Sequence, residues 1–248
     1  MLEKYLIEGY KSLSSKRCKE IYEAISEIRQ KMDLSQKESP YHQNPRLLLA
    51  TKTRTPDEIN FAKEIGIDLI GENRVQELLD KYDKLQRDGL EIHFIGALQT
   101  NKVKYIIDKV DVIHSLDRLS LAKEIDRQAK KINKIMKVLV EVNIGDEESK
   151  SGLSVQDVIP FLNDVKEFKN IQVCGLMSIP PILTTKLQQK QYFQKIMGLY
   201  IDISTKKIDN ISMDVLSFGM SSDYDVAIEC GSNLVRIGTA AFGSRNYN

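Results

Sequence analysis

Short apolar runs alternate with segments of helical periodicity eight times along this chain of 248 residues. Strands that alternate with helices pair in parallel through right-handed crossovers, because each helix returns the chain to the same edge of the sheet. Eight such units in about 250 residues match the size of a closed (β/α)8 barrel, the TIM barrel. The eight runs cover residues 47–50, 68–73, 92–96, 110–114, 137–143, 173–179, 213–219 and 234–238.

Helical segments lie between these runs and before the first of them. Apolar residues at helical spacing predict one long or broken helix in an amino-terminal extension, 1–32, and Thr55-Pro56 is typical of a helix start. We expect a single domain over 1–248, with the barrel strands and helices in 46–239 and the polar stretch 33–44 as a surface connection. Further helices are predicted in 74–86, 120–131, 155–168, 187–206 and 224–230.

A doubly wound open sheet is the alternative architecture. That fold carries a Gly-x-Gly-x-x-Gly sequence after its first strand, where the glycines let the backbone approach a pyrophosphate. No such sequence follows residues 47–50. The closed barrel of α/β class is therefore the favoured fold.

The charge balance disfavours nucleic acid and anionic membranes as partners. The 36 basic and 35 acidic side chains leave a net charge of +1, so no global field attracts a polyanion. Cys18, Cys174 and Cys230 are odd in number and widely spaced, which disfavours a disulfide framework or a metal site and fits a reducing cytoplasm. Neither a signal peptide nor a membrane span is expected, because no apolar run reaches about 18 residues.

Lys52 closes the first apolar run, Arg46-Leu-Leu-Leu-Ala-Thr-Lys52. The carboxyl ends of barrel strands line the site, where little water surrounds a side chain. An amine with an ordinary pKa of about 10.4 becomes nucleophilic there, because desolvation or a cationic neighbour lowers that pKa. Lys52 is the candidate for a Schiff base with an aldehyde, and a lone lysine snorkelling from a strand end is the alternative.

Hydroxyls and a glycine follow the last two predicted strands. Ser221-Ser222 and Gly238-Thr239 stand where barrels most often bind phosphate through loop amides. Each pair alone is more often a helix cap or a turn, but their occurrence after both strands favours phosphate. Phosphate together with a Schiff-base lysine leaves two candidates, a sugar-phosphate aldolase and a protein that holds pyridoxal phosphate.

Seven longer motifs fall along the chain in a fixed order. They are Ala50-Thr-Lys52, Gly71-Glu-Asn-Arg-Val-Gln-Glu77, His93-Phe-Ile-Gly-Ala-Leu-Gln-Thr-Asn-Lys102, Ser149-Lys-Ser-Gly152, Gly175-Leu-Met177, Leu216-Ser-Phe-Gly-Met-Ser221 and Val235-Arg-Ile-Gly-Thr-Ala-Ala-Phe-Gly243. In these motifs, from about residue 47 to 247, the chain closely resembles the pyridoxal phosphate homeostasis proteins. The resemblance implies a barrel like that of alanine racemase, although Ala97 replaces an expected proline. The resemblance also disfavours the sugar-phosphate aldolase.

The resemblance implies a role for each residue of a cofactor site. Lys52 would carry pyridoxal 5'-phosphate as a Schiff base, the phosphate would be held by the loops after the last two strands, and Arg236 would face the pyridine nitrogen. For His93 a hydrogen bond between strands remains an equal alternative to ring contact, and the two methionines are as well explained by packing. The expected cofactor-binding residues are Lys52, Asn73, His93, Met177, Ser217, Met220, Ser221, Arg236, Gly238 and Thr239.

Arg236 bears on the chemistry of such a site. A guanidinium is a permanent donor, so it bonds a pyridine nitrogen only when that nitrogen is unprotonated. The cofactor is then a weaker electron sink, which suits holding it, or racemisation, better than transamination. The alternative for Arg236 is an ion pair with an acid outside the barrel.

The expected function is pyridoxal phosphate homeostasis, by buffering the cofactor or delivering it to dependent apoenzymes, with little or no catalysis. A racemase needs a second acid or base opposite the lysine, and in alanine racemases it comes with a further carboxy-terminal domain, whereas this sequence ends at Asn248. The alternative is a pyridoxal phosphate-dependent amino acid racemase or decarboxylase in which Tyr224, His93 or Lys150 supplies that group. A cytoplasmic monomer is expected.

Overall fold

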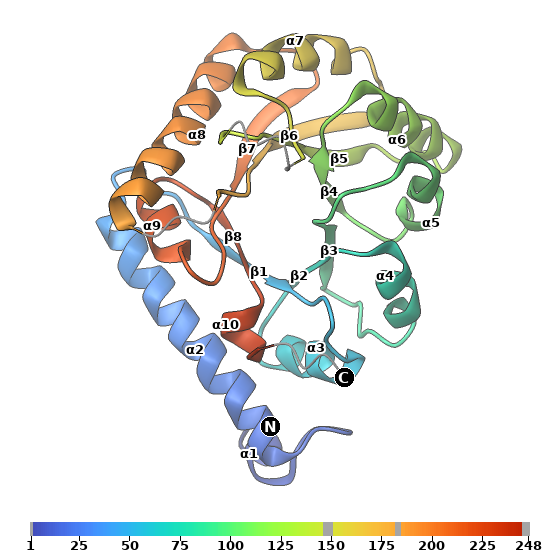
Figure 1. Ribbon diagram of the computed structural model, residues 1–248. Helices are drawn as coiled ribbons and strands as arrows, with labels where there is room; N and C mark the ends of the chain where they lie inside the picture. The colour runs from blue at the N-terminus through green and yellow to red at the C-terminus, as the bar shows by residue number, and fades with distance from the viewer. Residues whose placement is uncertain (1, 146–150, 182–184, 245–248) are drawn as a thin grey trace.

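The eight expected strands form a closed parallel barrel in the computed structural model, which describes residues 2–145, 151–181 and 185–244 (Figure 1). Each strand pairs with the next along the chain, and β8 closes the barrel against β1. The predicted fold is therefore confirmed. The strands are β1 Arg46–Ala50, β2 Leu69–Glu72, β3 Glu91–Phe94, β4 Val112–Leu116, β5 Met136–Glu141, β6 Ile171–Met177, β7 Ile211–Ser217 and β8 Leu234–Ile237.

The two faces of each strand pack into different layers. On β5, Val138 and Val140 point outward into the main core beneath the helices, whereas Leu139 points into the barrel against Met177. This alternation follows from the two-residue period of side chains along a strand. The inward face of β5 then ends in Glu141, a buried acid. Polar side chains are thus carried inward at the carboxyl end of the barrel.

Helices surround the barrel, and the helix after β1 begins at a start signal in the sequence. Thr55 and Glu58 form a reciprocal capping box at the start of α3 Pro56–Glu64, in which each side chain bonds the other residue's backbone N–H. A short helix that the sequence did not indicate, α5 Val103–Ile106, follows the 3-10 turn η1 Thr100–Lys102. The remaining helices of the barrel are α4 Val75–Tyr82, α6 Leu119–Lys131, α7 Val155–Val165, α8 Lys186–Lys206, α9 Tyr224–Glu229 and α10 Thr239–Phe242.

The amino-terminal extension is a pair of helices, α1 Leu2–Glu8 and α2 Ser15–Glu38, and α2 lies along α9 and α10 (Figure 1). The helix was expected to end at residue 32, with 33–44 as a surface connection, but α2 continues to Glu38. The reason is that Ser35 is buried on the same face as Met32, and neither proline nor glycine interrupts residues 33–38. Ser39 then ends the helix in extended backbone.

Arg17 ties the extension to the barrel. Its Nη2 lies 2.5 Å from Glu58 Oε1 and donates to the carbonyl of Phe242 over 2.8 Å, so one side chain on α2 joins α3 and α10. Among the described helices none combines the length and apolar character needed to cross a bilayer.

Candidate functional site

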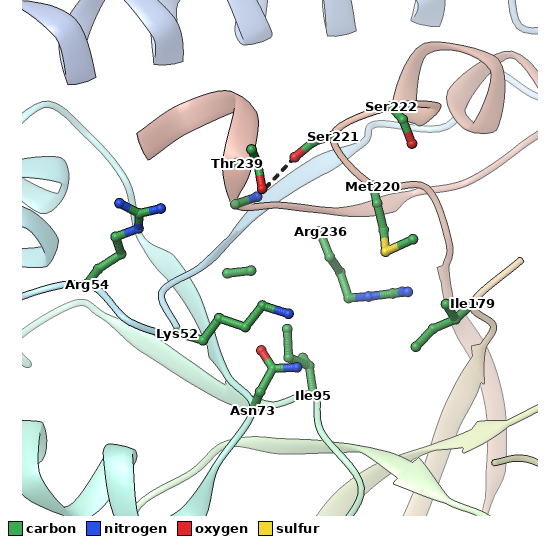
Figure 2. A pocket seen from close by; sticks show the side chains of 12 residues that line it. Lys52, Arg54, Asn73, Ile95, Ile179, Met220, Ser221, Ser222, Arg236 and Thr239 are labelled. Atoms are coloured by element: carbon green, nitrogen blue, oxygen red, sulfur yellow. Dashed lines mark hydrogen bonds between the residues drawn. The ribbon is translucent and has the colours of Figure 1, made fainter. Parts of the chain in front are cut away.

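A pocket of about 430 Å³ opens at the carboxyl ends of the strands, where several elements contribute side chains (Figure 2). Seven of the ten residues expected around a cofactor line it, and Ala50, Arg54, Ile95, Ile179 and Ser222 complete the lining. The expected residues that the structure brings together are Lys52, Asn73, Met220, Ser221, Arg236, Gly238 and Thr239.

Lys52 and Arg236 both line this pocket, and the amine of Lys52 points toward Arg236 (Figure 2). Ala50 is the last residue of β1, and Lys52 comes two residues later. The side chains of Ala50 and Lys52 therefore both point inward. Arg236 lies on β8 and is 5% exposed. Its Nη1 donates to the Ser217 carbonyl over 2.9 Å, and its Nη2 donates to the Ser178 carbonyl over 3.1 Å. These bonds hold the guanidinium inside the barrel, so the alternative of an ion pair outside it does not apply.

Burial makes Arg236 a weaker base than an ordinary arginine. Desolvation lowers the pKa of its guanidinium to about 10, while Glu141 and Asp223 oppose that shift. The group therefore remains a cation at neutral pH. A buried cation of this kind can donate hydrogen bonds to a ligand but cannot accept them.

Ser221 connects the loops that follow β7 and β8. Its Oγ accepts hydrogen bonds from the backbone N–H of Gly238 over 3.3 Å and of Ala240 over 3.2 Å. The hydroxyl thus faces the start of α10 and does not cap the helix that follows it. A Cβ at Gly238 would lie 3.1 Å from the Ala50 carbonyl oxygen, so the backbone passes close to β1. Hydroxyls and loop amides gather here, as an oxyanion requires.

Asn73 leaves an acceptor in the pocket wall. Its Oδ1 is buried and accepts no hydrogen bond from the described part of the chain. The neighbouring loop fits closely, because a Cβ at Gly96 would lie 2.1 Å from the Asn73 carbonyl oxygen. A buried oxygen without a partner costs free energy, so its position suits a ligand that can donate a hydrogen bond.

His93 lies deeper in the barrel than the pocket. Its Nδ1 is 2.8 Å from His114 Nε2, and its Nε2 is 2.7 Å from Glu91 Oε1. Burial lowers the pKa of both imidazoles. Three successive inward positions of this strand are Glu91, His93 and Ile95, and only Ile95 reaches the pocket. The structure therefore favours the interstrand hydrogen bond over ring contact for His93.

Met177 and Ser217 are also buried below the pocket lining. Met177 is 1% exposed and packs against Leu139 and Cys174 inside the barrel. Ser217 is fully buried, and Arg236 Nη1 donates to its Oγ over 2.6 Å. Met177 ends β6 and Ser217 ends β7. At these two strands the pocket is lined by residues of the loops that follow the strands. Ser217 does not line the pocket itself but bonds Arg236, which does.

Glu141 is an acid near the site that the sequence analysis did not single out. It ends β5, is 7% exposed and interacts electrostatically with Arg236 and Asp117. The pKa of its carboxyl is raised to about 7, mainly by burial and also by Asp117, while Arg236 opposes the shift. The signal in the sequence was an acid closing a valine-rich run, two residues before the Asn143 that was expected to end the strand.

The three side chains that were considered as a second acid or base are not found at the pocket among the described residues. Tyr224 on α9 is 6% exposed, and Lys31 Nζ of α2 lies 5.0 Å from its ring centroid, so the phenol packs outside the barrel. His93 is bonded to Glu91 below the pocket. Lys150 lies outside the described residues. Neither described group lines the pocket.

The cysteines are free and buried, at positions 18, 174 and 230. Within residues 2–145, 151–181 and 185–244, no group of three or more His, Cys, Asp or Glu side chains could hold a metal ion.

Comparisons with known proteins bear on both the fold and the pocket. The family described as alanine racemase, N-terminal domain, matches residues 26–246. A pyridoxal phosphate homeostasis protein of Aquifex aeolicus is 46% identical over 202 residues, which are 82% of this chain and 88% of that protein. An unknown protein from Bifidobacterium adolescentis has a crystal structure with TM-score 0.88 and 30% identity, over 94% of this chain and 98% of that one.

A further solved structure contains the cofactor. PipY of Synechococcus elongatus with pyridoxal phosphate bound is 28% identical, with TM-score 0.79, over 90% of this chain and 100% of that one.

Proposed function

Because the chain belongs to the family of the alanine racemase N-terminal domain and, within it, to the pyridoxal phosphate homeostasis proteins, we propose that it binds pyridoxal 5'-phosphate in the pocket around Lys52. The single observation that carries the proposal is the convergence of an amine, a buried guanidinium and a cluster of hydroxyls in one cavity. PipY, a related barrel, has been solved with this cofactor.

The donor set fits each end of the cofactor. The hydroxyls of Ser221 and Thr239 and the backbone amides after Gly238 suit a phosphate. The unpartnered Oδ1 of Asn73 suits a donor on the ring. Arg236, as a cation without acceptor capacity, suits an unprotonated pyridine nitrogen. The phosphate, a donor on the ring and the pyridine nitrogen thus each have a complementary group in the lining.

Lys52 is the attachment point in this proposal. Its amine adds to the cofactor aldehyde, a C=N bond forms, and water leaves, which gives a Schiff base. The bound cofactor supplies an electron-withdrawing ring, and Arg236 weakens that property because it favours the unprotonated pyridine. The chain would therefore hold the cofactor with little catalysis of its own.

The proposed role is cofactor homeostasis in the cytoplasm, by buffering pyridoxal phosphate or delivering it to apoenzymes that need it. The names of the relatives support this role. A monomeric, single-domain carrier is the simplest form of the proposal. The alternative is an amino acid racemase or decarboxylase, which requires an acid or base opposite Lys52. The observation that favours this alternative is the raised pKa of the buried Glu141 carboxyl, which suits an acid or base near neutral pH.

The test is the absorbance spectrum of the purified chain, before and after borohydride reduction, with peptide mapping and an amino acid turnover assay on the same sample. A chromophore trapped on Lys52 without turnover would support the carrier. Lys52→Ala is expected to lose the covalent attachment and keep weaker binding through the phosphate loops. Deuterium exchange at Cα of an amino acid that depends on Lys52 would favour the racemase instead, and no chromophore after added cofactor would reject both.

A further inference from the structure

A buried ion-pair network lies behind Lys52, on the outer face of the barrel wall. Lys81 on α4 places its Nζ 3.0 Å from Glu72 Oε1 on β2 and 2.6 Å from Glu77 Oε1 on α4. The side chains of Glu72 and Lys81 are 1% and 9% exposed. Burial raises the pKa of Glu72, and Lys81 and Thr51 oppose that shift. Glu72 and Lys81 are charges taken out of water, which costs free energy, whereas the side chain of Glu77 is 20% exposed, and none of the three lines the pocket.

This network bonds the backbone on both sides of Lys52. Lys81 Nζ donates to the Thr51 carbonyl over 2.8 Å, and Thr51 Oγ1 donates to Glu72 Oε1 over 2.7 Å. On the other side, the backbone N–H of Thr53 donates to Glu77 Oε1. The residues before and after Lys52 are therefore attached to the same three charges.

The bond to Thr53 acts at a strained position. Thr53 has φ of +66°, in the left-handed region that β-branched residues rarely occupy because Cβ approaches the backbone oxygen. Such a conformation persists only when the surroundings hold it. The Glu77 carboxylate is the group that holds this N–H, and the turn sends Thr53 outward while Lys52 points into the pocket.

We propose that Glu72, Glu77 and Lys81 are positioning residues, which fix the backbone at Lys52 and so aim its amine into the pocket. The inference rests on the proposed function in taking Lys52 as the attachment point. A held amine spends more of its time in an attacking geometry than one on a loose turn. The network thus controls how readily Lys52 reacts, without touching the ligand.

The experiment compares variants of the full-length, cofactor-free chain. Glu77→Ala removes the acceptor for Thr53 on a helix where alanine is well tolerated, whereas Glu77→Gln keeps an acceptor oxygen. Lys81→Met removes the central cation. The matched control is Lys134→Met, because Lys134, like Lys81, donates to backbone carbonyls, those of Ile107 over 3.0 Å and Val110 over 2.6 Å, but these carbonyls are far along the chain from Lys52.

Two readouts need no cofactor. Amide hydrogen exchange at Thr53 should be roughly ten- to a hundredfold faster in Glu77→Ala, as expected for a lost bond to a charged group, and close to wild type in Glu77→Gln and Lys134→Met. Competitive labelling of Lys52 with trace acetic anhydride should become like that of an exposed lysine in Glu77→Ala and Lys81→Met.

A third readout uses added pyridoxal phosphate. The fraction of bound cofactor that borohydride traps on Lys52 should fall several-fold in Glu77→Ala and Lys81→Met, recover in Glu77→Gln and stay constant in Lys134→Met. Unchanged exchange and labelling in Glu77→Ala would overturn the inference, as would an equal loss of trapping in the control. If the wild type binds no cofactor, the proposed function fails, and the first two readouts still decide on the network.

Discussion

The hydroxyl oxygen of Ser217 lies 2.6 Å from Nη1 of Arg236, and the Ser217 carbonyl accepts from the same nitrogen over 2.9 Å. The two residues face each other from neighbouring strands, β7 and β8. With the Ser178 carbonyl on Nη2, they fix the plane of the guanidinium. The orientation of Arg236 in the pocket is therefore set by residues that lie beneath the pocket.

Ser217→Ala tests this relationship. Losing a hydrogen bond to a charged group should lower the free energy of unfolding by about 1.5–3 kcal/mol, and a looser guanidinium should weaken pyridoxal phosphate binding by up to about tenfold. Urea unfolding and a fluorescence titration measure the two effects. Ser204→Ala, at an exposed residue of α8 outside the pocket lining, is the control for the titration. Lower stability with unchanged affinity would limit Ser217 to a structural role.

Arg236 variants separate charge from hydrogen bonding. Glutamate at this position would join the acids Glu141 and Asp223 in a buried space, so Arg236→Glu should lose about 3–5 kcal/mol of stability or fail to fold. Arg236→Gln should keep the fold and shift the absorbance of the bound cofactor, because the ring nitrogen loses a cationic neighbour. A glutamine variant whose spectrum superimposes on the wild type would argue that the guanidinium does not face the ring.

Glu141 should make stability depend on pH. Its carboxyl has a pKa of about 7 in the folded chain, above the ordinary value of 4.5, mainly because of burial. The unfolded state therefore loses its proton first, so the free energy of unfolding falls by about 3 kcal/mol as pH rises from 4.5 to about 7 and is level above. Glu141→Gln should remove this pH dependence, and near pH 8 its urea midpoint should be higher than that of the wild type. A difference between variant and wild type that does not vary with pH would contradict the assignment.

His93 should contribute to stability and not to ligand affinity. Burial lowers its pKa below 6.5, so the neutral folded ring favours the native state above that pH, and the contribution is lost as pH falls through the unfolded value. His93→Gln should cost about 1–3 kcal/mol of unfolding free energy and leave pyridoxal phosphate affinity within about twofold. A large loss of affinity in a folded variant would restore the role of ring contact.

Gly96 should control the position of Asn73. A Cβ there would lie 2.1 Å from the Asn73 carbonyl oxygen, so Gly96→Ala must displace the loop after β2 and should cost about 1–3 kcal/mol together with cofactor affinity. Gly198 in α8 has open space around its missing Cβ, so Gly198→Ala should gain roughly 0.5–1 kcal/mol. Thermal unfolding of both variants gives the comparison, and a stabilised Gly96→Ala would refute the close contact.

The sequence predicted the barrel because each strand is a short apolar run followed by polar residues, a local pattern that needs no tertiary information. Residues just after strands, such as Lys52 and Ser221, were found for the same reason. The level of a side chain along the barrel axis was harder to predict. Periodicity indicates that His93 faces inward but not that Ile95, one inward position later, is the residue at the pocket.

Two other differences have the same physical origin. The end of α2 was missed because its last turn carries polar residues. The reason that this turn is helical, the burial of Ser35, is visible only in the folded chain. Glu141 was missed because its importance depends on Arg236, which lies on β8, and on Asp117, which follows β4. Both depend on contacts between distant parts of the sequence, which local patterns do not record.

The turn that follows β1 has two sides with different roles. Thr51 and Thr53 are bonded to charges outside the wall, while Lys52 between them enters the pocket. Residence time of a covalently held ligand depends on how fast its bond to the amine breaks, and recognition depends on the groups that touch it. From the proposed role of the network, we expect a change on the outer face to alter the first and leave the second intact. Under the proposed function, substitutions on the outer face should change the rate at which the ligand is released while its selectivity is preserved.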